Sequence, residues 1–266
     1  MNAPDLTSRL PASLQFELDG VVAIVRLTRT VKRNALDDET VRGIETVFGN
    51  LPAEVRAVVL AAHGEHFSAG LDLSSLVAAQ AATDSLRRSR LWYRAFDLIQ
   101  FGDVPVIAAL HGAVIGGGLE LASAAHIRVA DRSTYYALPE AQRGIFVGGG
   151  GSVRISRLIG PARMMDLMLT GRVYDADEGQ QIGISQYLVD AGTAEARALE
   201  LARRVATIPP LSVFGILHAI PRNAEADPAT GYLLENLMAT IASNDPAAQA
   251  RITDFLAGRA AKVQKT

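Results

Sequence analysis

Two glutamates, Glu120 and Glu140, stand in stretches whose composition makes the backbone turn. Glu120 comes two residues after the glycine triplet 116–118, and Glu140 follows Pro139. Two carboxyl groups beside one water molecule can divide the roles of acid and base if their surroundings give them different protonation states. Each glutamate also has a purely structural interpretation, as an acid in the first turn of a helix or in a turn after proline. The pair is the first candidate for chemistry in this chain.

Two loops rich in small residues could supply hydrogen-bond donors to the same reaction. Residues 68–71 (SAGL) and 116–118 (GGG) each follow an apolar run and lead into a segment with helical character. If the loops lie side by side, the N–H groups of Leu71 and Gly117 converge on one oxygen and form an oxyanion hole. Small residues are needed there because larger side chains would block a carbonyl group.

Other motifs fit known sites less well. Residues 63–66 (HGEH) do not have a standard zinc spacing, so we expect no metal site. His66 stands where the motif G-x-S-x-G would place its first glycine before Ser68, so a serine nucleophile is not expected. The glycine run 148–151 lacks the Gly-Lys-Ser/Thr ending of a phosphate-binding loop. We expect it to turn the chain into a helix near Arg154 whose N-terminus would face the active site.

The elements that position these residues alternate between strands and helices. Apolar and β-branched runs predict strands, and Asp-Gly between two of them predicts a hairpin turn at Asp19-Gly20. Helical spacing of apolar residues predicts helices, one of which begins at Asp37-Asp38. In chain order these are the hairpin 14–28, helix 38–51, strand 55–62, helix 84–101, strand 104–110 and the segments 126–131 and 135–140. This order indicates an α/β fold in layers.

The chain becomes mostly helical after residue 192. Helices are predicted over 193–207, 211–220, 228–243 and 245–258, with breaks at Pro209-Pro210 and at Pro221. We therefore divide the chain into a core, residues 1–192, and a helical region, residues 193–266. Apolar residues of that region have no obvious partner in the core, so it is expected to mediate oligomerisation: Leu233, Leu234, Leu237, Met238 and Ile241.

Composition excludes several classes of function. The 266 residues carry a formal net charge of −2, so a basic nucleic-acid surface is not indicated. Because there is no cysteine, disulfides, thiolate metal sites and a cysteine nucleophile are excluded. The polar N-terminal residues 1–13 resemble neither a secretory signal nor a transit peptide, and no apolar run is long enough to span a membrane. The expected location is the cytoplasm, without a membrane partner.

Three segments in this order resemble the crotonase, or enoyl-CoA hydratase/isomerase, superfamily. They are 66–73 (HFSAGLDL), 105–122 (PVIAALHGAVIGGGLELA) and 137–160 (ALPEAQRGIFVGGGGSVRISRLIG). The resemblance covers roughly the whole chain. It implies a crotonase fold with repeated ββα units and a C-terminal helical trimerisation region, commonly in a hexamer built as a dimer of trimers. It also implies that Leu71 and Gly117 hold the carbonyl of an acyl-CoA thioester, and that no cofactor is needed because the substrate carries CoA.

Members of this superfamily hydrate, isomerise, hydrolyse or cleave their substrates, so the superfamily alone does not identify the reaction. The two glutamates narrow the range of possible reactions. Hydratases that resemble this chain have glutamates at both positions, whereas many isomerase-type relatives keep only one. We therefore expect Glu120 and Glu140 to catalyse the addition of water to a 2-enoyl-CoA. A CoA-thioester hydrolase or an enoyl-CoA isomerase on the same scaffold is the alternative. A non-catalytic member that binds RNA or a partner fits less well, since the glutamate pair is complete.

The resemblance also suggests where the substrate lies. Val147 stands where common hydratases have proline, and this pattern looks most like the hydratases that act on methylthioacryloyl-CoA, which also hydrolyse the CoA thioester. The segment 76–92 and the C-terminal helices are expected to line the acyl pocket. By analogy with the family, two basic side chains would contact the CoA phosphates, although a solvated basic pair is as good an interpretation, and backbone groups nearby would contact the adenine. The residues implied in CoA binding are Lys32, Arg33, Ala35, Ala69, Asp72 and Leu73.

Overall fold

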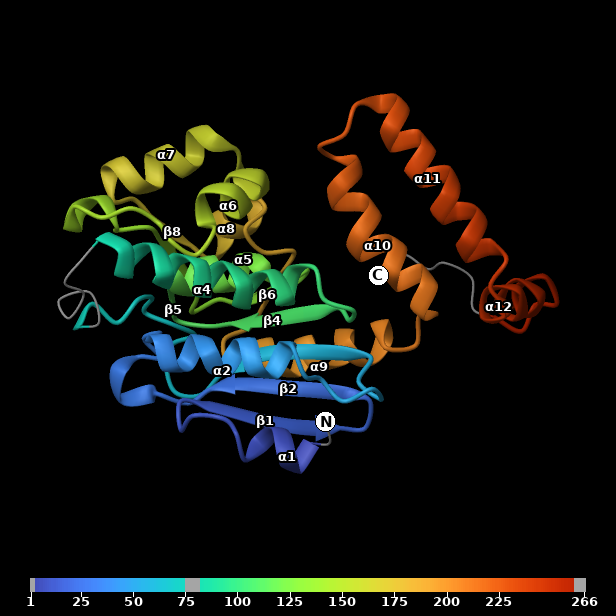
Figure 1. Ribbon diagram of the computed structural model, residues 1–266, viewed down its shortest axis with the longest axis horizontal. Coiled ribbons are helices and arrows are strands. Elements are labelled where there is room, and N and C mark those ends of the chain that lie inside the picture. The colour runs from blue at the N-terminus through green and yellow to red at the C-terminus, as the bar shows by residue number, and fades with distance from the viewer. Residues whose placement is uncertain (1–2, 75–81, 261–266) are drawn as a thin grey trace. The chain divides into compact units, whose positions relative to one another are not determined.

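Six strands form the larger of two sheets in the computed structural model, which describes residues 3–74 and 82–260 (Figure 1). The strand order in this sheet is β1-β2-β3-β4-β6-β9, and the smaller sheet has the order β5-β7-β8. The pair β1 and β2 is antiparallel, and the other neighbours in the larger sheet are parallel. The strands are β1 (Leu14–Asp19), β2 (Val22–Leu27), β3 (Ala57–Ala62), β4 (Val106–Leu110), β5 (Ala113–Ile115), β6 (Ile127–Asp131), β7 (Tyr135–Ala137), β8 (Val173–Asp175) and β9 (Tyr187–Val189).

Helices follow the strands in a recurring order, in which two strands lead into one helix. The units β1-β2-α2, β4-β5-α5 and β6-β7-α6 show this pattern, so the predicted α/β fold with repeated ββα units is confirmed. The helices are α1 (Ala3–Thr7), α2 (Asp38–Phe48), α4 (Ala82–Gln100), α5 (Gly117–Ala124), α6 (Gly151–Ile159), α7 (Pro161–Thr170), α8 (Ala176–Gln181), α9 (Ala194–Val205), α10 (Pro210–Asn223), α11 (Pro228–Ser243) and α12 (Pro246–Leu256). Two short 3-10 helices, η1 (Thr30–Lys32) and η2 (Ala141–Arg143), lie in loops.

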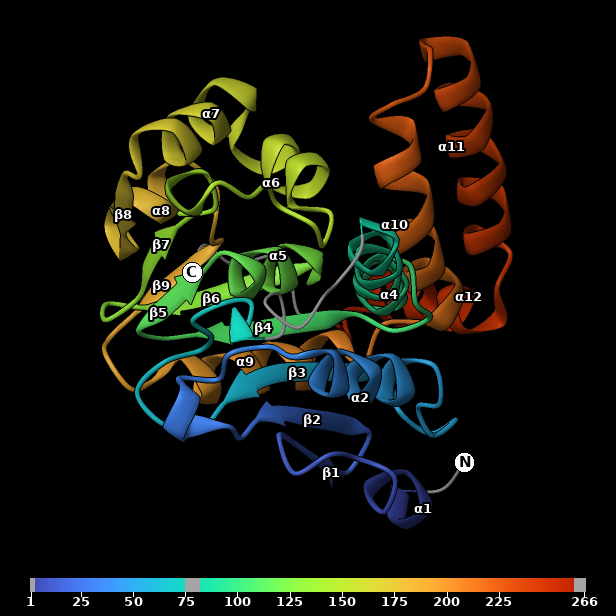
Figure 2. The same cartoon turned by 60° about the vertical axis from the view of Figure 1, so that its left-hand side comes forward.

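Both faces of the larger sheet are covered, because successive side chains along each strand point to opposite faces. Val58 and Leu60 of β3 belong to a core that includes residues of α2 and α4, whereas Val59 belongs to a second core with residues of α9. The views in Figures 1 and 2 show α9 along the sheet. Parallel strands buried on both faces are apolar at nearly every position, which is why residues 57–62 read AVVLAA.

The helix α9 belongs to the same compact unit as the sheets. That unit ends at Ala206, and the second unit begins at Thr207. The sequence had suggested a boundary after residue 192, but the apolar side chains of Ala198 and Leu201 pack on the sheet and join α9 to the core. The second unit contains α10, α11 and α12.

A proline stands in the first turn of each of α10, α11 and α12, and one further proline lies inside α10. Pro210 begins α10 after Pro209 at the N-cap, as predicted, since a proline at the first helical position loses no internal hydrogen bond. The break predicted at Pro221 is wrong, because α10 continues to Asn223. Pro221 lies in the last turn of the helix, where its missing N–H costs only one hydrogen bond before the helix ends.

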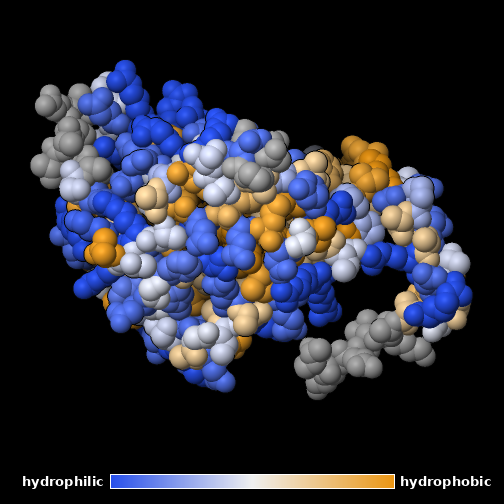
Figure 3. Space-filling view, turned by 90° about the horizontal axis from the view of Figure 1, so that it is seen from below, coloured by the Kyte–Doolittle hydropathy of each residue, from blue (hydrophilic) through white to orange (hydrophobic). Residues whose placement is uncertain are grey.

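Among the residues that the structure describes, no helix is both long enough and apolar enough to cross a membrane. On the face shown in Figure 3, hydrophobic residues occur in patches between hydrophilic ones.

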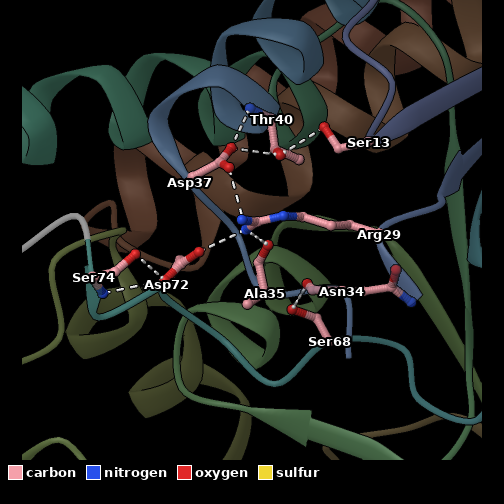
Figure 4. Close-up of polar contacts among 9 residues, drawn as sticks. All are labelled: Ser13, Arg29, Asn34, Ala35, Asp37, Thr40, Ser68, Asp72 and Ser74. Carbon is pink, nitrogen blue, oxygen red and sulfur yellow. Dashed lines mark hydrogen bonds and ion pairs between the residues drawn. The ribbon is translucent and has the colours of Figure 1, made fainter. Parts of the chain in front are cut away.

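A network of polar side chains ties the loop before α2 to the loop after residue 70 (Figure 4). The guanidinium of Arg29 lies 2.7 Å from the carboxylate of Asp72 and 3.2 Å from that of Asp37. Asp37 caps α2 by accepting a hydrogen bond from the Thr40 N–H. Asp72 also accepts hydrogen bonds from the N–H and hydroxyl of Ser74. Arg29 is thus the cation that joins two loops far apart in the sequence.

We expect the substitution Arg29→Met to lower the free energy of unfolding by about 1–3 kcal/mol at neutral pH, because it removes the charged partner of a buried carboxylate. Hydrogen bonds from Ser74, and then the Arg29 pair, hold the pKa of Asp72 at about 2, below its ordinary 3.8. Stabilisation from a lowered pKa is complete above the unfolded-state pKa and is lost as pH falls toward the folded-state value. The difference from wild type should therefore shrink between about pH 4 and about pH 2.

Guanidinium unfolding followed by circular dichroism measures this difference. The matched control is Arg132→Met, which removes one partner of an exposed ion pair with Asp177 and should leave the midpoint close to that of wild type. Equal unfolding midpoints for Arg29→Met and wild type would contradict the structural role of Arg29.

Candidate active site

Two hydrogen bonds of the Ser68 backbone place the two predicted donor loops side by side. The Ser68 N–H donates to the carbonyl of Ala113 at 2.9 Å, and the Ile115 N–H donates to the carbonyl of Ser68 at 3.0 Å. On the other side of the same loop, the Leu36 N–H donates to the Gly70 carbonyl at 2.7 Å. Three stretches of backbone therefore run next to one another at the end of the larger sheet.

The N–H groups of Leu71 and Gly117 are left available by this arrangement. Among the residues described, neither N–H donates a hydrogen bond to another part of the chain. A Cβ atom built on Gly117 would lie 3.3 Å from the Leu71 nitrogen, so the two donors are close together. Gly70 is needed between them, because its φ is +89° and a Cβ there would lie 2.6 Å from the carbonyl oxygen of Ile115. The pair has the proximity required of an oxyanion hole.

Glu120 lies in the first turn of α5 and its carboxylate reaches the N-terminus of α6. Its Oε1 accepts hydrogen bonds from the N–H groups of Gly149 at 2.7 Å and Gly151 at 2.8 Å. The glycine run does turn the chain into a helix, as the sequence predicted, and α6 begins at Gly151. A helix N-terminus with free N–H groups is a favourable place for a carboxylate.

Burial and hydrogen bonding act on Glu120 in opposite directions. The residue is 3% exposed, and this burial is the larger influence, so the pKa of Glu120 is raised. The N–H groups of Gly151 and Gly149 and the charge of Arg154 oppose the rise. Arg154 is itself held by Asp97 at 2.5 Å and by the carbonyl of Gly149 at 2.7 Å. The cation thus supports both the carboxylate and the loop that binds it.

Glu140 approaches the same place from the loop after β7. Its Oε1 lies next to Gly116, where an added Cβ would be 2.7 Å away. Its buried Oε2 has no hydrogen-bond partner among the described residues. Burial raises the pKa of Glu140 to about 7, and the nearby charge of Glu120 adds to the rise while Arg143 opposes it. Burial therefore favours the protonated form of Glu140 at a pH where an ordinary glutamate is ionised.

One cavity of about 280 Å³ brings both glutamates and both N–H donors together. The four residues predicted to do chemistry, Glu120, Glu140, Leu71 and Gly117, all line it. Its other lining residues are Ser85, Arg88, Ser89, Trp92, Ile145, Phe146, Gly148 and Gly149. The arrangement can hold a carbonyl oxygen at one point and place two carboxyl groups near the atoms next to it.

The helix α4 supplies a wall of this cavity whose individual residues the sequence did not single out. Ser85, Arg88, Ser89 and Trp92 follow helical spacing and line the same side. They lie within the segment 76–92 that was expected to form the acyl pocket, although residues 76–81 are outside the described part of the chain. Spacing alone could have grouped these four side chains, but which face of α4 turns inward depends on its packing.

The residues suggested for CoA binding do not line this cavity. Lys32 and Arg33 are exposed, and Arg33 lines a separate hollow of about 350 Å³ together with His63 and His66. Ala69 and Asp72 already use their N–H groups within the chain, as donors to the carbonyls of Arg33 and Leu36. A backbone contact from these two residues to a ligand would therefore use a carbonyl oxygen. Ala35 is half-buried, and Leu73 is exposed.

The polar residues that we did not expect to be catalytic have structural contacts. The hydroxyl of the fully buried Ser68 donates to the Asn34 carbonyl at 2.8 Å (Figure 4). His66 accepts a hydrogen bond from the N–H of Ala113 through Nδ1. Within residues 3–74 and 82–260, no group of three or more histidine or acidic side chains is arranged to hold a metal ion.

Comparison with known proteins places this chain among enzymes that act on CoA thioesters. The family model described as enoyl-CoA hydratase/isomerase matches residues 17–261. The short-chain-enoyl-CoA hydratase of Clostridium acetobutylicum is 32% identical over 224 residues, which cover 83% of this chain and 85% of that protein. YngF of Bacillus subtilis, provisionally named an enoyl-CoA hydratase/isomerase, is 33% identical over 218 residues, covering 80% of this chain and 83% of YngF.

A solved structure gives the same result for the fold. A crystal structure from Rhodopseudomonas palustris, of a protein provisionally named an enoyl-CoA hydratase, superposes with a TM-score of 0.91 at 56% identity. The superposition covers 94% of this chain and 96% of that one. The crotonase fold expected from the sequence is thus confirmed, and the chain belongs to the enoyl-CoA hydratase/isomerase family.

Proposed function

We propose that this protein adds water to the double bond of a short 2-enoyl-CoA thioester. The observation that carries the proposal is the single cavity lined by two carboxyl groups and by two backbone N–H donors. Its volume of about 280 Å³ supports a short acyl group. The family to which the chain belongs supports the reaction type, and the presence of both glutamates favours hydration over isomerisation.

The N–H groups of Leu71 and Gly117 bind the thioester carbonyl oxygen. When the oxygen of a water molecule adds to the β-carbon, electrons move from the double bond to this carbonyl oxygen, and the two donors stabilise the charge that develops. Loss of one such donor typically costs about 10²–10³ in rate. Glu120 takes a proton from the attacking water, and Glu140 gives a proton to the α-carbon, so that one water is added in total.

The surroundings of the two glutamates support this division of roles. Burial raises the pKa of Glu120 above its ordinary value, but two N–H hydrogen bonds and the charge of Arg154 oppose this rise and stabilise the ionised form that acts as a base. Glu140 has a buried oxygen without a partner among the described residues and a pKa near 7, which favours a protonated form that can act as an acid. Because the two groups interact, the pair shares one proton over a range of pH.

The CoA part of the substrate would leave the cavity along the adjacent stretches 32–35 and 69–73. Lys32 and Arg33 would meet its phosphates, and backbone groups around Ala69, Asp72 and Leu73 would meet its adenine, as the family resemblance suggests. Ala35 would also contact CoA. For the acyl group, methylthioacryloyl-CoA is one candidate, supported by Val147 and by the aromatic wall at Trp92, since thioether sulfur packs well on aromatic rings. That candidate includes hydrolysis of the thioester after hydration.

Two substrates separate these reactions. Incubation with crotonyl-CoA and with methylthioacryloyl-CoA is followed by the absorbance of the conjugated double bond and by free CoA separated by chromatography. Free CoA is measured rather than total thiol, because hydration at the sulfur-bearing carbon of methylthioacryloyl-CoA also releases methanethiol. Loss of conjugation without free CoA supports hydration alone, and release of CoA supports hydration with hydrolysis. If neither substrate changes, the hydratase proposal is wrong.

Removal of either glutamate should abolish hydration. We expect Glu120→Ala and Glu140→Ala each to lower kcat by about 10²–10⁴, the usual effect of losing a positioned acid or base. Glu120→Ala should also lose any release of CoA, because Glu120 lies in the same first turn of α5 as the Gly117 donor. Glu140→Ala should retain some hydrolysis of an already hydrated thioester.

The control for these variants is Glu54→Ala, since Glu54 is an exposed acid outside the cavity. Its kcat should equal that of wild type. If Glu120→Ala retains CoA release while Glu140→Ala loses it, the roles of the two residues are reversed.

The reaction should lose rate at alkaline pH. An acid that must be protonated is available below its pKa and is lost above it, so kcat/KM for crotonyl-CoA should fall tenfold per pH unit above about pH 7. It should also fall at acid pH, where Glu120 becomes protonated and can no longer act as the base. Carbon NMR of protein labelled at the glutamate carboxyl groups gives an independent measurement, in which the signal missing from Glu140→Gln should titrate near pH 7. Titration of that signal below about pH 5 would contradict the assignment.

We also propose that the second unit mediates assembly into a trimer or a hexamer. Met238 of α11 lies against Gly215 of α10, while Leu233, Leu237 and Ile241 of α11 are about half exposed or more. Such a row of exposed apolar side chains is typical of a protein–protein contact.

Light scattering at micromolar concentration should therefore give the mass of three or six chains. The double substitution Leu233→Glu and Leu237→Glu should shift the mass toward that of one chain, whereas Leu169→Glu, at an exposed leucine of α7, should not. A monomeric wild-type protein would overturn this proposal.

A further inference from the structure

The cavity wall formed by α4 carries polar side chains that hydration does not use. Ser85, Arg88 and Ser89 line the same cavity as the two glutamates, on one face of the helix. The N–H donors fix the thioester end of the substrate, and the glutamates must flank its double bond. The rest of the lining therefore receives the far end of the acyl group. An acyl chain that ends in a methyl group would place only hydrocarbon beside these three polar side chains.

Arg88 is the charged side chain of this wall, and Asp38 is its carboxylate partner within the chain. Its side chain is 14% exposed, and its Nε lies 3.1 Å from the carboxylate of Asp38. Burial of a cation beside hydrocarbon is unfavourable, whereas a guanidinium matches the geometry of a carboxylate with two parallel hydrogen bonds. Hydroxyl groups on either side, from Ser85 and Ser89, can donate further hydrogen bonds to the same oxygens.

The surroundings of Arg88 carry more positive than negative charge. Arg88 also lines a second hollow, of about 480 Å³, so it stands between that hollow and the cavity. The second hollow is lined by five arginines, two aspartates and one leucine: Arg42, Arg87, Arg88, Arg90, Arg94, Asp38, Asp84 and Leu91.

Some of these arginines are neutralised and some are not. Arg87 pairs with Asp84, and Arg94 pairs with Glu45. In the part of the chain that the structure describes, no carboxylate pairs with Arg42 or Arg90. The excess of cations raises the electrostatic potential at the Arg88 end of the cavity, which stabilises an anion there.

We propose that the acyl group of the substrate ends in a carboxylate, and that Arg88 binds this carboxylate with help from Ser85 and Ser89. The inference rests on the proposed hydration of a 2-enoyl-CoA and names the class of acyl group at that site. A neutral thioether acyl group would offer no negative charge to Arg88. The substrate class is a 2-enoyl-CoA whose far end carries a carboxylate, and Arg88 is a specificity-determining residue.

The test compares pairs of substrates that differ only at this end. Each straight-chain 2-enoyl-CoA with a terminal carboxylate is assayed against its methyl ester, over a series of chain lengths. Wild type should favour the carboxylate, by kcat/KM, at the chain length that reaches Arg88. Arg88→Met should reduce that preference by about 10- to 100-fold, the range expected for losing a hydrogen bond to a charged group. Arg88→Lys should restore part of it.

The matched control is Arg87→Met, on the same helix but outside the cavity lining and already paired with Asp84. It should change the preference by less than about twofold, as expected for an exposed ion pair. Added salt should change the carboxylate preference of Arg88→Met only slightly, because this variant lacks the direct contact with the carboxylate.

The outcomes separate this inference from the proposed hydration. If crotonyl-CoA is hydrated but wild type never favours a carboxylate, the inference is overturned and the hydration stands. If Arg88→Met raises KM equally for charged and uncharged substrates, Arg88 serves the CoA part instead and the inference is also overturned. If no 2-enoyl-CoA is hydrated at all, the proposed function itself fails.

Discussion

The hydrogen bonds between Ser68 and the strand β5 are the constraint on which the cavity depends. They fix the separation of two loops at the distance between neighbouring strands, which leaves no room for a side chain between the loops. Gly70 meets this condition because it has a positive φ and no Cβ to strike the carbonyl of Ile115. The N–H of Gly117, at the first position of α5, has no acceptor within its helix, and the N–H of Leu71 donates to no other described residue, so both can bind a ligand. The polar network of Arg29, Asp37 and Asp72 supports the outer side of the same loop, so that the position of Leu71 is determined from both sides.

Burial of two carboxyl groups is the energetic cost of this design, and the protein treats the two groups differently. Glu120 is compensated by backbone donors at the start of α6 and by Arg154 behind them. Glu140 receives little compensation, so its proton is bound more tightly than in water. The difference arises because Glu120 belongs to a helix that packs against another helix terminus, whereas Glu140 belongs to a loop. Two glutamates in one cavity can act as an acid and a base because their hydrogen-bond partners and neighbouring charges differ.

Much of this organisation could be predicted from the sequence, because it is encoded by local residue types. The turn at Asp19-Gly20, the helix 228–243, the glycine turn that leads into the helix of Glu120 and the loop that carries Glu140 all follow from glycine, proline and apolar spacing. Features that depend on tertiary packing could not be predicted in this way. The pair of Arg29 and Asp72 joins residues 43 positions apart, and nothing local marks either partner. The inward face of α4 and the attachment of α9 to the sheet likewise become evident only when the elements are packed. Pro221 shows the opposite error. The rule that proline interrupts a helix predicted a break there, but Pro221 lies in the last turn of α10 and the helix continues past it.

Activation of the carbonyl uses main-chain groups, while the far wall of the cavity uses side chains of a single helix. A point mutation at Leu71 exchanges its side chain but keeps its N–H, so the activating group is robust to genetic change. The positions 85, 88, 89 and 92 have no such protection, and each mutation there alters the wall directly. The side chains that determine the acyl preference and the main-chain groups that activate the carbonyl therefore lie in different parts of the chain. Trp92 is constrained, because its ring lies against Gly117 and Gly149. A new acyl preference can therefore arise by changes at positions 85, 88 and 89 of α4, and a combinatorial library restricted to these three codons would explore substrates while the catalytic groups stay in place.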